Sequence, residues 1–367
     1  MDDPIIDGAC AEDPDGQCTD PADVDEDGHG THVAGTIASP INGTGIAGVA
    51  PRVTLVNLRA GQDSGYFFLE PTVNALVYGA NAGVDVVNMS FYVDPWLYNC
   101  TANPADSPEA QQQQRTIRVA MQRALDYARS KGVTLIAALG NENTDLGNPV
   151  IDETSPDYPP DTAYPRTIDN SCIDVPAESE GVISVSAIGP SGNKADYSNW
   201  GLEQTDLSAP GGFFRDFPGT DRNRTPENLI LAPYPKALAE ANGQLEADGT
   251  PNDPFVVRDC TAAGICGYYQ YLQGTSMAAP HATGVAALIV SRYGKGDRKR
   301  GGKTLRPSVT EWYLRNSARD TACPEPRLVT YPDRDETYNA VCEGTPERNG
   351  FYGDGIVDAA AAVGAKR

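Results

Sequence analysis

The sequence contains few histidines and few basic residues. It has three His, and its 28 Lys and Arg face 50 Asp and Glu, so the formal net charge of the 367 residues is −22. A surface of this charge repels phosphate backbones, so we expect no nucleic-acid partner. No apolar run approaches the roughly 20 residues that cross a bilayer, so we expect no membrane partner. With 40% apolar and 21% charged residues, the composition is that of a globular protein.

Cysteine is present in an even number, eight. No CxxC pair stands with histidines at zinc-finger spacing, so a metal site of that kind is not favoured. Six cysteines form three pairs that are close in sequence: Cys10 with Cys18, Cys260 with Cys266, and Cys323 with Cys342. Cys100 and Cys172 remain for a fourth disulfide, although eight cysteines allow many other pairings. Disulfides indicate an oxidising compartment, and therefore a secreted protein, yet no signal peptide follows Met1.

Apolar runs alternate with helical stretches between about residues 53 and 187. We expect strands at residues 53–58, 84–90, 133–139 and 182–187, and helices at residues 70–82 and 109–131. Gly83 and Gly132 stand where such helices end. Continuous apolar strands that alternate with helices predict a three-layer α/β/α fold with a mainly parallel sheet. In such sheets, sites form at the carboxyl ends of the strands.

Three segments interrupt this alternation, at about residues 93–108, 143–176 and 212–270. They are rich in Pro, Asp and Asn, and each contains at least one cysteine. Long loops in a compact domain serve a function or need covalent staples. We therefore expect one domain over residues 1–367, with three long surface insertions.

All three histidines lie in two segments crowded with small residues. The first is Asp27-Gly28-His29-Gly30-Thr31-His32, and the second is Gly274-Thr275-Ser276-Met277-Ala278-Ala279-Pro280-His281. A serine hydroxyl is a poor nucleophile unless an imidazole takes its proton. The two segments resemble, in the same order, the His and Ser signatures of the subtilisin-like serine proteases (subtilases). The resemblance implies that His29 is the general base, Ser276 the nucleophile, and His32 and His281 structural helix residues.

Other segments extend the resemblance from about residue 25 to residue 363. Ala138-Leu139-Gly140-Asn141-Glu142 is similar to the oxyanion segment, which implies that Asn141 stabilises the oxyanion together with the backbone N–H of Ser276. Residues 86–90 are similar to the substrate-binding strand. The implied substrate-binding residues are Ser90, Phe91 and Tyr92, with Ser64 and Gly65 on the opposing strand. Subtilases usually have Gly where Tyr92 stands, so its ring either obstructs this edge or rebuilds the pocket.

The catalytic Asp of the family lies on a strand before the His motif, in an apolar run followed by Asp, Thr or Ser, and Gly. Ile5-Ile6-Asp7-Gly8 is the nearest match, but it lacks the Thr or Ser. We expect Asp7 to be a loop residue and the native chain to continue upstream of Met1 with the triad Asp. The loop at residues 41–46 matches one that binds calcium in many subtilases. The resemblance implies no required cofactor, and a structural calcium ion at most.

The resemblance implies a monomeric, secreted serine endopeptidase that acts on proteins or peptides. Because the triad Asp is not evident, the alternative is a catalytically impaired pseudoprotease, a binding module on the subtilase fold. An esterase or a peptide ligase that uses the same residues is a third, weaker alternative. We expect the 367-residue chain by itself to be nearly inactive.

Overall fold

The computed structural model describes residues 24–62, 64–298 and 301–364. Its helices are α2 (His29–Ala38), α3 (Leu69–Ala82), α4 (Pro108–Ser130), α5 (Lys236–Ala241), α6 (Thr275–Tyr293), α7 (Pro307–Ser317) and α8 (Ala359–Ala362). The strands of the central sheet are β1 (Val86–Met89), β2 (Thr134–Ala138), β5 (Ile183–Ile188) and β6 (Leu207–Pro210). Shorter strands outside this sheet are β3 (Ile151–Asp152), β4 (Arg166–Thr167), β7 (Ile230–Pro233), β8 (Val256–Cys260), β9 (Cys266–Leu272), β10 (Lys295–Gly296), β11 (Lys303–Thr304), β12 (Leu328–Val329) and β13 (Ala340–Val341).

The four central strands form a parallel sheet in the order β1-β2-β5-β6. The predicted helices and three of the predicted strands are therefore confirmed to within a few residues. Helix α4 begins where Ser107 accepts a hydrogen bond from Ala110 N through its side chain, with Pro108 in the first turn. Helix α3 ends at Gly83, whose φ of 88° lies in the left-handed region.

Helices cover both faces of this sheet, as the residues of β2 show. Leu135 and Ala137 belong to one apolar cluster, together with α3 and α4. Ile136 and Ala138 belong to a second cluster, together with α6 and Leu314 of α7. Because successive side chains of a strand point to opposite faces, these two clusters are the two interfaces of a three-layer α/β/α fold. The predicted fold class is confirmed.

The strand predicted at residues 53–58 is wrong. This segment is irregular, and Leu55 and Val56 are 49% and 47% exposed. It pairs with no strand in the described part of the chain. An apolar run becomes a strand only when a neighbouring strand accepts its backbone hydrogen bonds, which the run itself does not encode.

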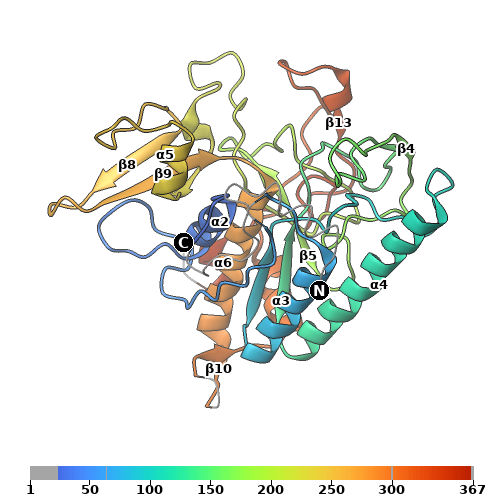
Figure 1. Ribbon diagram of the computed structural model, residues 1–367, viewed down its shortest axis with the longest axis horizontal. Coiled ribbons are helices and arrows are strands. Elements are labelled where there is room, and N and C mark those ends of the chain that lie inside the picture. Colours follow the sequence, from blue (N-terminus) through green and yellow to red (C-terminus); the bar gives the residue numbers. More distant parts are fainter. Residues whose placement is uncertain (1–23, 63, 299–300, 365–367) are drawn as a thin grey trace.

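The segment at residues 212–270 is more regular than its composition suggests. Strands β7, β9 and β8 form an antiparallel sheet in that order, beside α5, and lie on the same side of the molecule as α2 (Figure 1). A disulfide joins Cys260 to Cys266 at the end of the β8–β9 hairpin. His32 is fully buried on α2, and its Nε2 lies 3.0 Å from both Ile230 O and Gln270 O. The His32 ring thus ties α2 to this sheet.

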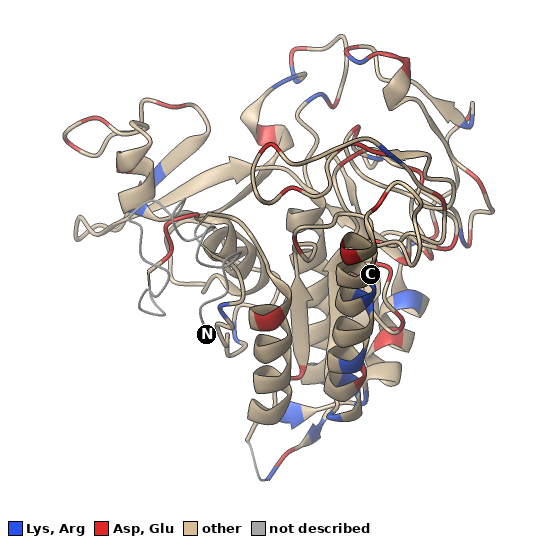
Figure 2. Ribbon diagram, turned by 45° about the vertical axis from the view of Figure 1, so that its right-hand side comes forward, with Lys and Arg blue, Asp and Glu red and all other residues tan. Residues whose placement is uncertain are grey.

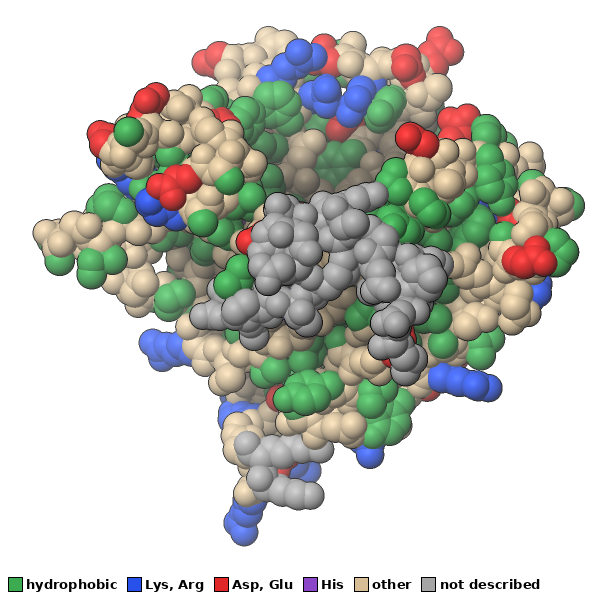
Figure 3. Space-filling model, viewed as in Figure 1, with side chains coloured by type: hydrophobic (Ala, Val, Ile, Leu, Met, Phe, Trp, Pro, Cys, Tyr) green, Lys and Arg blue, Asp and Glu red, His purple; other side chains and the backbone are tan. Residues whose placement is uncertain are grey.

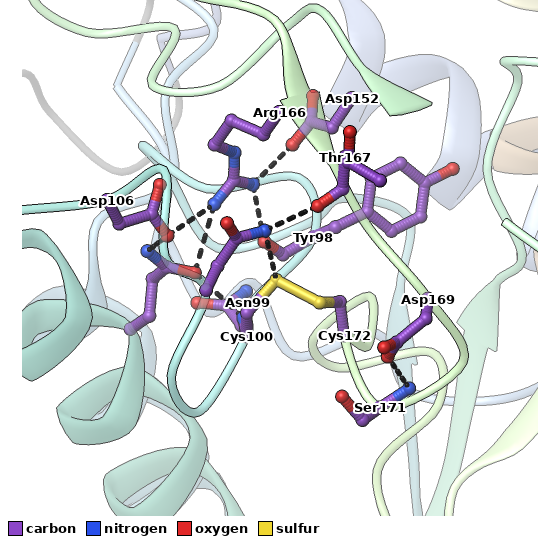
Figure 4. The surroundings of a disulfide bond; sticks show 12 residues. Tyr98, Asn99, Cys100, Asp106, Asp152, Arg166, Thr167, Asp169, Ser171 and Cys172 are labelled. Atoms are coloured by element: carbon purple, nitrogen blue, oxygen red, sulfur yellow. Dashed lines mark hydrogen bonds and ion pairs between the residues drawn. A yellow bond between two sulfur atoms is a disulfide. The ribbon is translucent and has the colours of Figure 1, made fainter. Parts of the chain in front are cut away.

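The other two predicted insertions are joined through Arg166, which is fully buried (Figure 4). Its guanidinium contacts Asp106 at 3.0 Å and also pairs with Asp152, and it donates to Tyr98 O at 2.8 Å. The disulfide Cys100–Cys172 lies beside this cluster and joins the same two segments. The structure therefore shows these loops held together by a buried ion-pair cluster and a covalent bond.

Three of the four predicted disulfides are confirmed: Cys100–Cys172, Cys260–Cys266 and Cys323–Cys342. The fourth prediction, Cys10–Cys18, lies outside the described residues. Asp7 also lies outside them. Among the described residues, no helix is both long and apolar enough to cross a membrane.

Charged side chains are distributed unevenly over the fold. Figure 2 shows many Asp and Glu in the loops at the carboxyl ends of the central strands, and Lys and Arg near the β10–β11 hairpin at the opposite end. Figure 3 shows hydrophobic side chains interspersed among polar ones on the face seen in Figure 1. Most of the Asp and Glu residues thus lie in loops.

Candidate active site

The first turn of α6 carries Ser276 and lies against the segment that follows β2. Asn141 Oδ1 accepts two hydrogen bonds there, from Thr275 N at 2.9 Å and from Thr275 Oγ1 at 3.0 Å. Gly140 N donates to Thr275 Oγ1 at 3.1 Å. These bonds fix which side of the Asn141 amide faces the helix, because only its oxygen can accept.

Two hydrogen-bond donors remain free beside Ser276. With its oxygen turned to Thr275, Asn141 presents its Nδ2 group, which donates to no residue in the described part of the chain. The backbone N–H of Ser276 likewise has no partner among those residues, as is usual in the first turn of a helix. Two unpaired donors next to a serine hydroxyl are suited to bind a carbonyl oxygen that becomes negatively charged.

Ser276 is also bonded to the end of β1. Its hydroxyl donates to Ser90 O at 3.4 Å, and Ser90 Oγ donates to Ser276 O at 3.0 Å. Ser90 is 7% exposed, whereas Ser276 is only half-buried and thus open to solvent. The structure therefore brings together three of the predicted site residues, Ser276, Asn141 and Ser90.

His29 is the first residue of α2, and α2 packs along α6 (Figure 1). The start of α2 is held by Asp25, whose Oδ1 accepts from Gly28 N at 2.7 Å and whose Oδ2 accepts from Thr31 N at 3.0 Å. The φ of Gly28 is 85°, and a Cβ there would come within 2.5 Å of the Tyr234 ring. Capping and a glycine thus set the position of His29.

The imidazole of His29 makes no hydrogen bond to a described residue, and Ser276 Oγ is directed at Ser90 O instead. Such contacts are often long in a structure without substrate. Burial lowers the pKa of His29, while the carboxylates of Asp27 and Asp25 oppose this shift. A lowered pKa keeps the ring neutral, which is the form that can take a proton from a hydroxyl.

The two predicted substrate-binding segments lie side by side. Phe91 stacks on Phe67 with ring centroids 4.2 Å apart, and Asp94 N donates to Phe67 O at 3.0 Å. Asp94 also accepts from Phe67 N. Burial, with the neighbouring Asp157 carboxylate, raises the pKa of Asp94 well above its ordinary value. The segments around Phe67 and Phe91 are therefore held together by a ring stack and by hydrogen bonds of Asp94.

Tyr92 is anchored on an insertion. Its hydroxyl donates to Asp157 Oδ2, and the ring is half-buried. Burial raises the pKa of Tyr92, and the nearby Asp157 raises it further. Opposite, Gly65 N donates to Gln62 O at 2.9 Å, and Ser64 Oγ donates to Gln62 Oε1 at 3.4 Å. Ser64 is half-buried and Gly65 is exposed, and these turn contacts do not test their role as substrate-binding residues.

The side-chain oxygens at the loop of residues 41–46 accept hydrogen bonds from the loop itself. Asn42 Oδ1 accepts from Thr44 N and from Thr44 Oγ1, both at 3.2 Å, and Asp259 Oδ2 accepts from Gly45 N at 2.6 Å. No group of three or more His, Cys, Asp or Glu side chains arranged for a metal occurs among the described residues. These side chains do not make up the roughly six to eight oxygens that Ca²⁺ takes. Calcium at this loop stays a prediction.

Sequence reasoning missed several polar residues around the site. Asp157 lies in an insertion, and no local pattern links it to Tyr92. Asn88 and Thr283 were not identified either, although Asn88 interrupts the apolar run of β1 and Thr283 lies seven residues after Ser276 on α6. Residues seven apart share one face of a helix, which is the signal that could have found Thr283.

Comparisons with known proteins show the family of this chain. A sequence model of the Subtilase family matches residues 7–351, so the chain belongs to the subtilases. It is 27% identical over 269 residues to subtilisin DY of Bacillus licheniformis, covering 73% of this chain and 65% of that protein. It is 29% identical over 288 residues to the major intracellular serine protease of Bacillus subtilis, covering 78% of this chain and 62% of that protein.

A solved structure supports the same fold. The epidermin leader peptide processing serine protease of Staphylococcus aureus superposes with a TM-score of 0.58 at 22% identity, covering 93% of this chain and 63% of that one. At this identity, the likeness concerns the fold alone. The chain thus spans just under two thirds of the length of these curated relatives.

Proposed function

We propose that this protein is a secreted serine endopeptidase that cleaves peptide bonds through an acyl-enzyme at Ser276. The observation that supports it best is the orientation of Asn141. Because Thr275 holds the Asn141 oxygen, the Nδ2 group and the Ser276 N–H remain as free donors beside the Ser276 hydroxyl. This pair of donors is what acyl transfer requires of an oxyanion site.

In the proposed mechanism, Ser276 Oγ attacks the carbonyl carbon of the scissile bond while His29 takes the hydroxyl proton. The carbonyl oxygen becomes an oxyanion bound by Asn141 Nδ2 and Ser276 N–H. His29 then gives its proton to the leaving amine, and the C–N bond breaks. A water molecule, deprotonated by His29, attacks the acyl-enzyme and releases the second product.

The proposed substrate is an extended peptide that lies between residues 64–65 and residues 90–92. An extended chain pairs with such segments through its backbone. In this proposal, Phe91 and Tyr92 determine side-chain preference, because the Phe67 stack and the bond to Asp157 hold both rings in place. The three disulfides support a secreted protein, and we propose that it acts as a monomer.

The test is hydrolysis of a peptide p-nitroanilide and of casein by the purified complete protein, because the 367-residue chain by itself is expected to be nearly inactive. Ser276→Ala and His29→Ala should each abolish hydrolysis. Asn141→Leu should lower kcat by about 100- to 1,000-fold with little change in KM, a magnitude known from subtilisins. Asn148→Leu is the matched control, because Asn148 is an exposed loop residue bonded to Asp145. Equal losses in the two Asn variants would contradict the proposed oxyanion site.

The alternative is a pseudoprotease that binds peptides without cleaving them. It is favoured by one observation: among the described residues, no carboxylate is bonded to the His29 ring. If the wild type binds casein but does not hydrolyse it, the alternative holds. If it does hydrolyse casein and Asp7→Asn abolishes hydrolysis, Asp7 is the triad Asp and not a loop residue.

A further inference from the structure

Helix α6 contains Pro280, and this proline affects the nucleophile directly. Residue 280 is four positions after Ser276, so its N–H would bond to the Ser276 carbonyl in an uninterrupted helix. Proline has no N–H. The Ser276 carbonyl therefore has no donor within the helix at this position and needs one from elsewhere.

Ser90 supplies that donor. Its hydroxyl, at the end of β1, donates to Ser276 O at 3.0 Å. Ser90 is 7% exposed, so the bond is protected from water. A hydroxyl has a single hydrogen and the Ser276 carbonyl can only accept, so this bond uses the one hydrogen that Ser90 Oγ can donate.

Two further residues continue this series of hydrogen bonds. Thr283 Oγ1, on α6, donates to Asn88 Oδ1 at 2.9 Å, and Asn88 Nδ2 donates to Ser90 Oγ at 2.9 Å. Because Ser276 O takes the only hydrogen of Ser90 Oγ, the Ser90 oxygen can only accept from Asn88, so the NH₂ group of Asn88 must face Ser90. The amide oxygen of Asn88 then faces α6, where the Thr283 hydroxyl donates to it. We call Thr283, Asn88, Ser90 and Ser276 the β1–α6 chain.

We propose that Thr283, Asn88 and Ser90 position the nucleophile: the β1–α6 chain replaces the backbone bond lost at Pro280 and sets the orientation of the first turn of α6. This inference rests on the proposed function, because it gives these residues a role in the reaction of Ser276. The first turn carries both the Ser276 hydroxyl and the Ser276 N–H. A small rotation of that turn would misplace the attacking atom and one oxyanion donor together.

The test is a set of variants in which single hydrogen bonds are removed and restored. Thr283→Val keeps the shape of a side chain that is 3% exposed and removes only its hydroxyl. We expect it to lower kcat by about 3- to 10-fold at unchanged KM, in line with the loss of one buried hydrogen bond. Thr283→Ser should restore kcat. The matched control is Thr310→Val on α7, which removes the hydroxyl of a fully buried threonine remote from Ser276 and should leave kcat unchanged.

Two double variants test the chain itself. Ser90→Ala should lower kcat at least as much as Thr283→Val, and Thr283→Val should have no further effect in the Ser90→Ala background. Pro280→Ala provides an N–H for the Ser276 carbonyl, so it should recover part of the activity lost in Ser90→Ala. Additive effects of Ser90→Ala and Thr283→Val, together with no recovery by Pro280→Ala, would overturn the proposal.

A measurement without catalysis separates this proposal from the proposed function. In hydrogen exchange, the amides of Met277 and Ala278, which bond to Gly274 O in the first turn of α6, should exchange faster in Thr283→Val than in the wild type. Thr310→Val should not change them. If the wild type hydrolyses nothing, the proposed function fails and this result still decides the positioning role. Unchanged exchange in Thr283→Val would overturn it.

Discussion

Replacing Arg166 by Met should destabilise the protein strongly. Arg166 contacts Asp106 at 3.0 Å and pairs with Asp152, and all three side chains are fully buried. Removing the guanidinium leaves two carboxylates buried without their cation. Breaking a buried ion pair from one side costs about 3–5 kcal/mol of the free energy of unfolding.

The assay is urea denaturation of variants made in a Ser276→Ala background, which removes the proposed nucleophile. Arg224→Met is the matched control. Arg224 pairs with Asp333 at 3.2 Å, with 52% and 37% of the two side chains exposed, so its loss should cost less than about 1 kcal/mol. A triple variant that also carries Asp106→Asn and Asp152→Asn should be more stable than Arg166→Met alone, because no charge is then left unpaired. Equal losses for Arg166→Met and Arg224→Met would refute this reasoning.

The remaining predictions concern pH. Asp27→Asn removes a charge that raises the pKa of His29, so the acid limb of kcat/KM should move to lower pH; a shift to higher pH would contradict this assignment. Burial lowers the pKa of Lys194 to about 7 in the folded protein. Above this pH the unfolded chain binds more protons than the folded protein does, so the free energy of unfolding should rise from about pH 7 to about pH 10. Thermal denaturation of Lys194→Met should lack that rise. Burial raises the pKa of Glu178 to about 7 in the folded protein. The folded protein then binds more protons than the unfolded chain does, so the free energy of unfolding should fall between about pH 4.5 and pH 7. In Glu178→Gln this fall should be smaller. An unchanged dependence of the free energy of unfolding on pH would contradict the role given to Glu178.

The central α/β layers could be predicted from the sequence because their patterns are local. Buried strands such as β2 read as continuous apolar runs, and α3 ends at a glycine that the sequence displays. The run at residues 53–58 has the same local pattern but forms no strand, since strand formation depends on a neighbour. The β8–β9 hairpin was missed because the surrounding segment is dominated by Pro, Asp and Asn.

The candidate site also combines residues that local motifs indicate with contacts that only the fold creates. His29, Ser276 and Asn141 stand in contiguous motifs, so the sequence alone can propose them as site residues. The contacts of Arg166 with two carboxylates join residues 60 and 14 positions apart, and burial of an arginine has no local signal. The bond between Thr283 and Asn88 spans 195 positions, so only the packing of α6 on β1 brings these residues together.

Covalent labelling with a fluorophosphonate tests the central claim most directly, because the reagent reports an activated serine without requiring a known substrate. In the complete protein we predict one adduct per chain, located at Ser276 by peptide mapping. It should be absent in Ser276→Ala and strongly reduced in His29→Ala, while Ser130→Ala, at the exposed end of α4, should label like the wild type. An adduct on another serine that persists in Ser276→Ala, or a wild-type protein that remains unlabelled, would contradict the account.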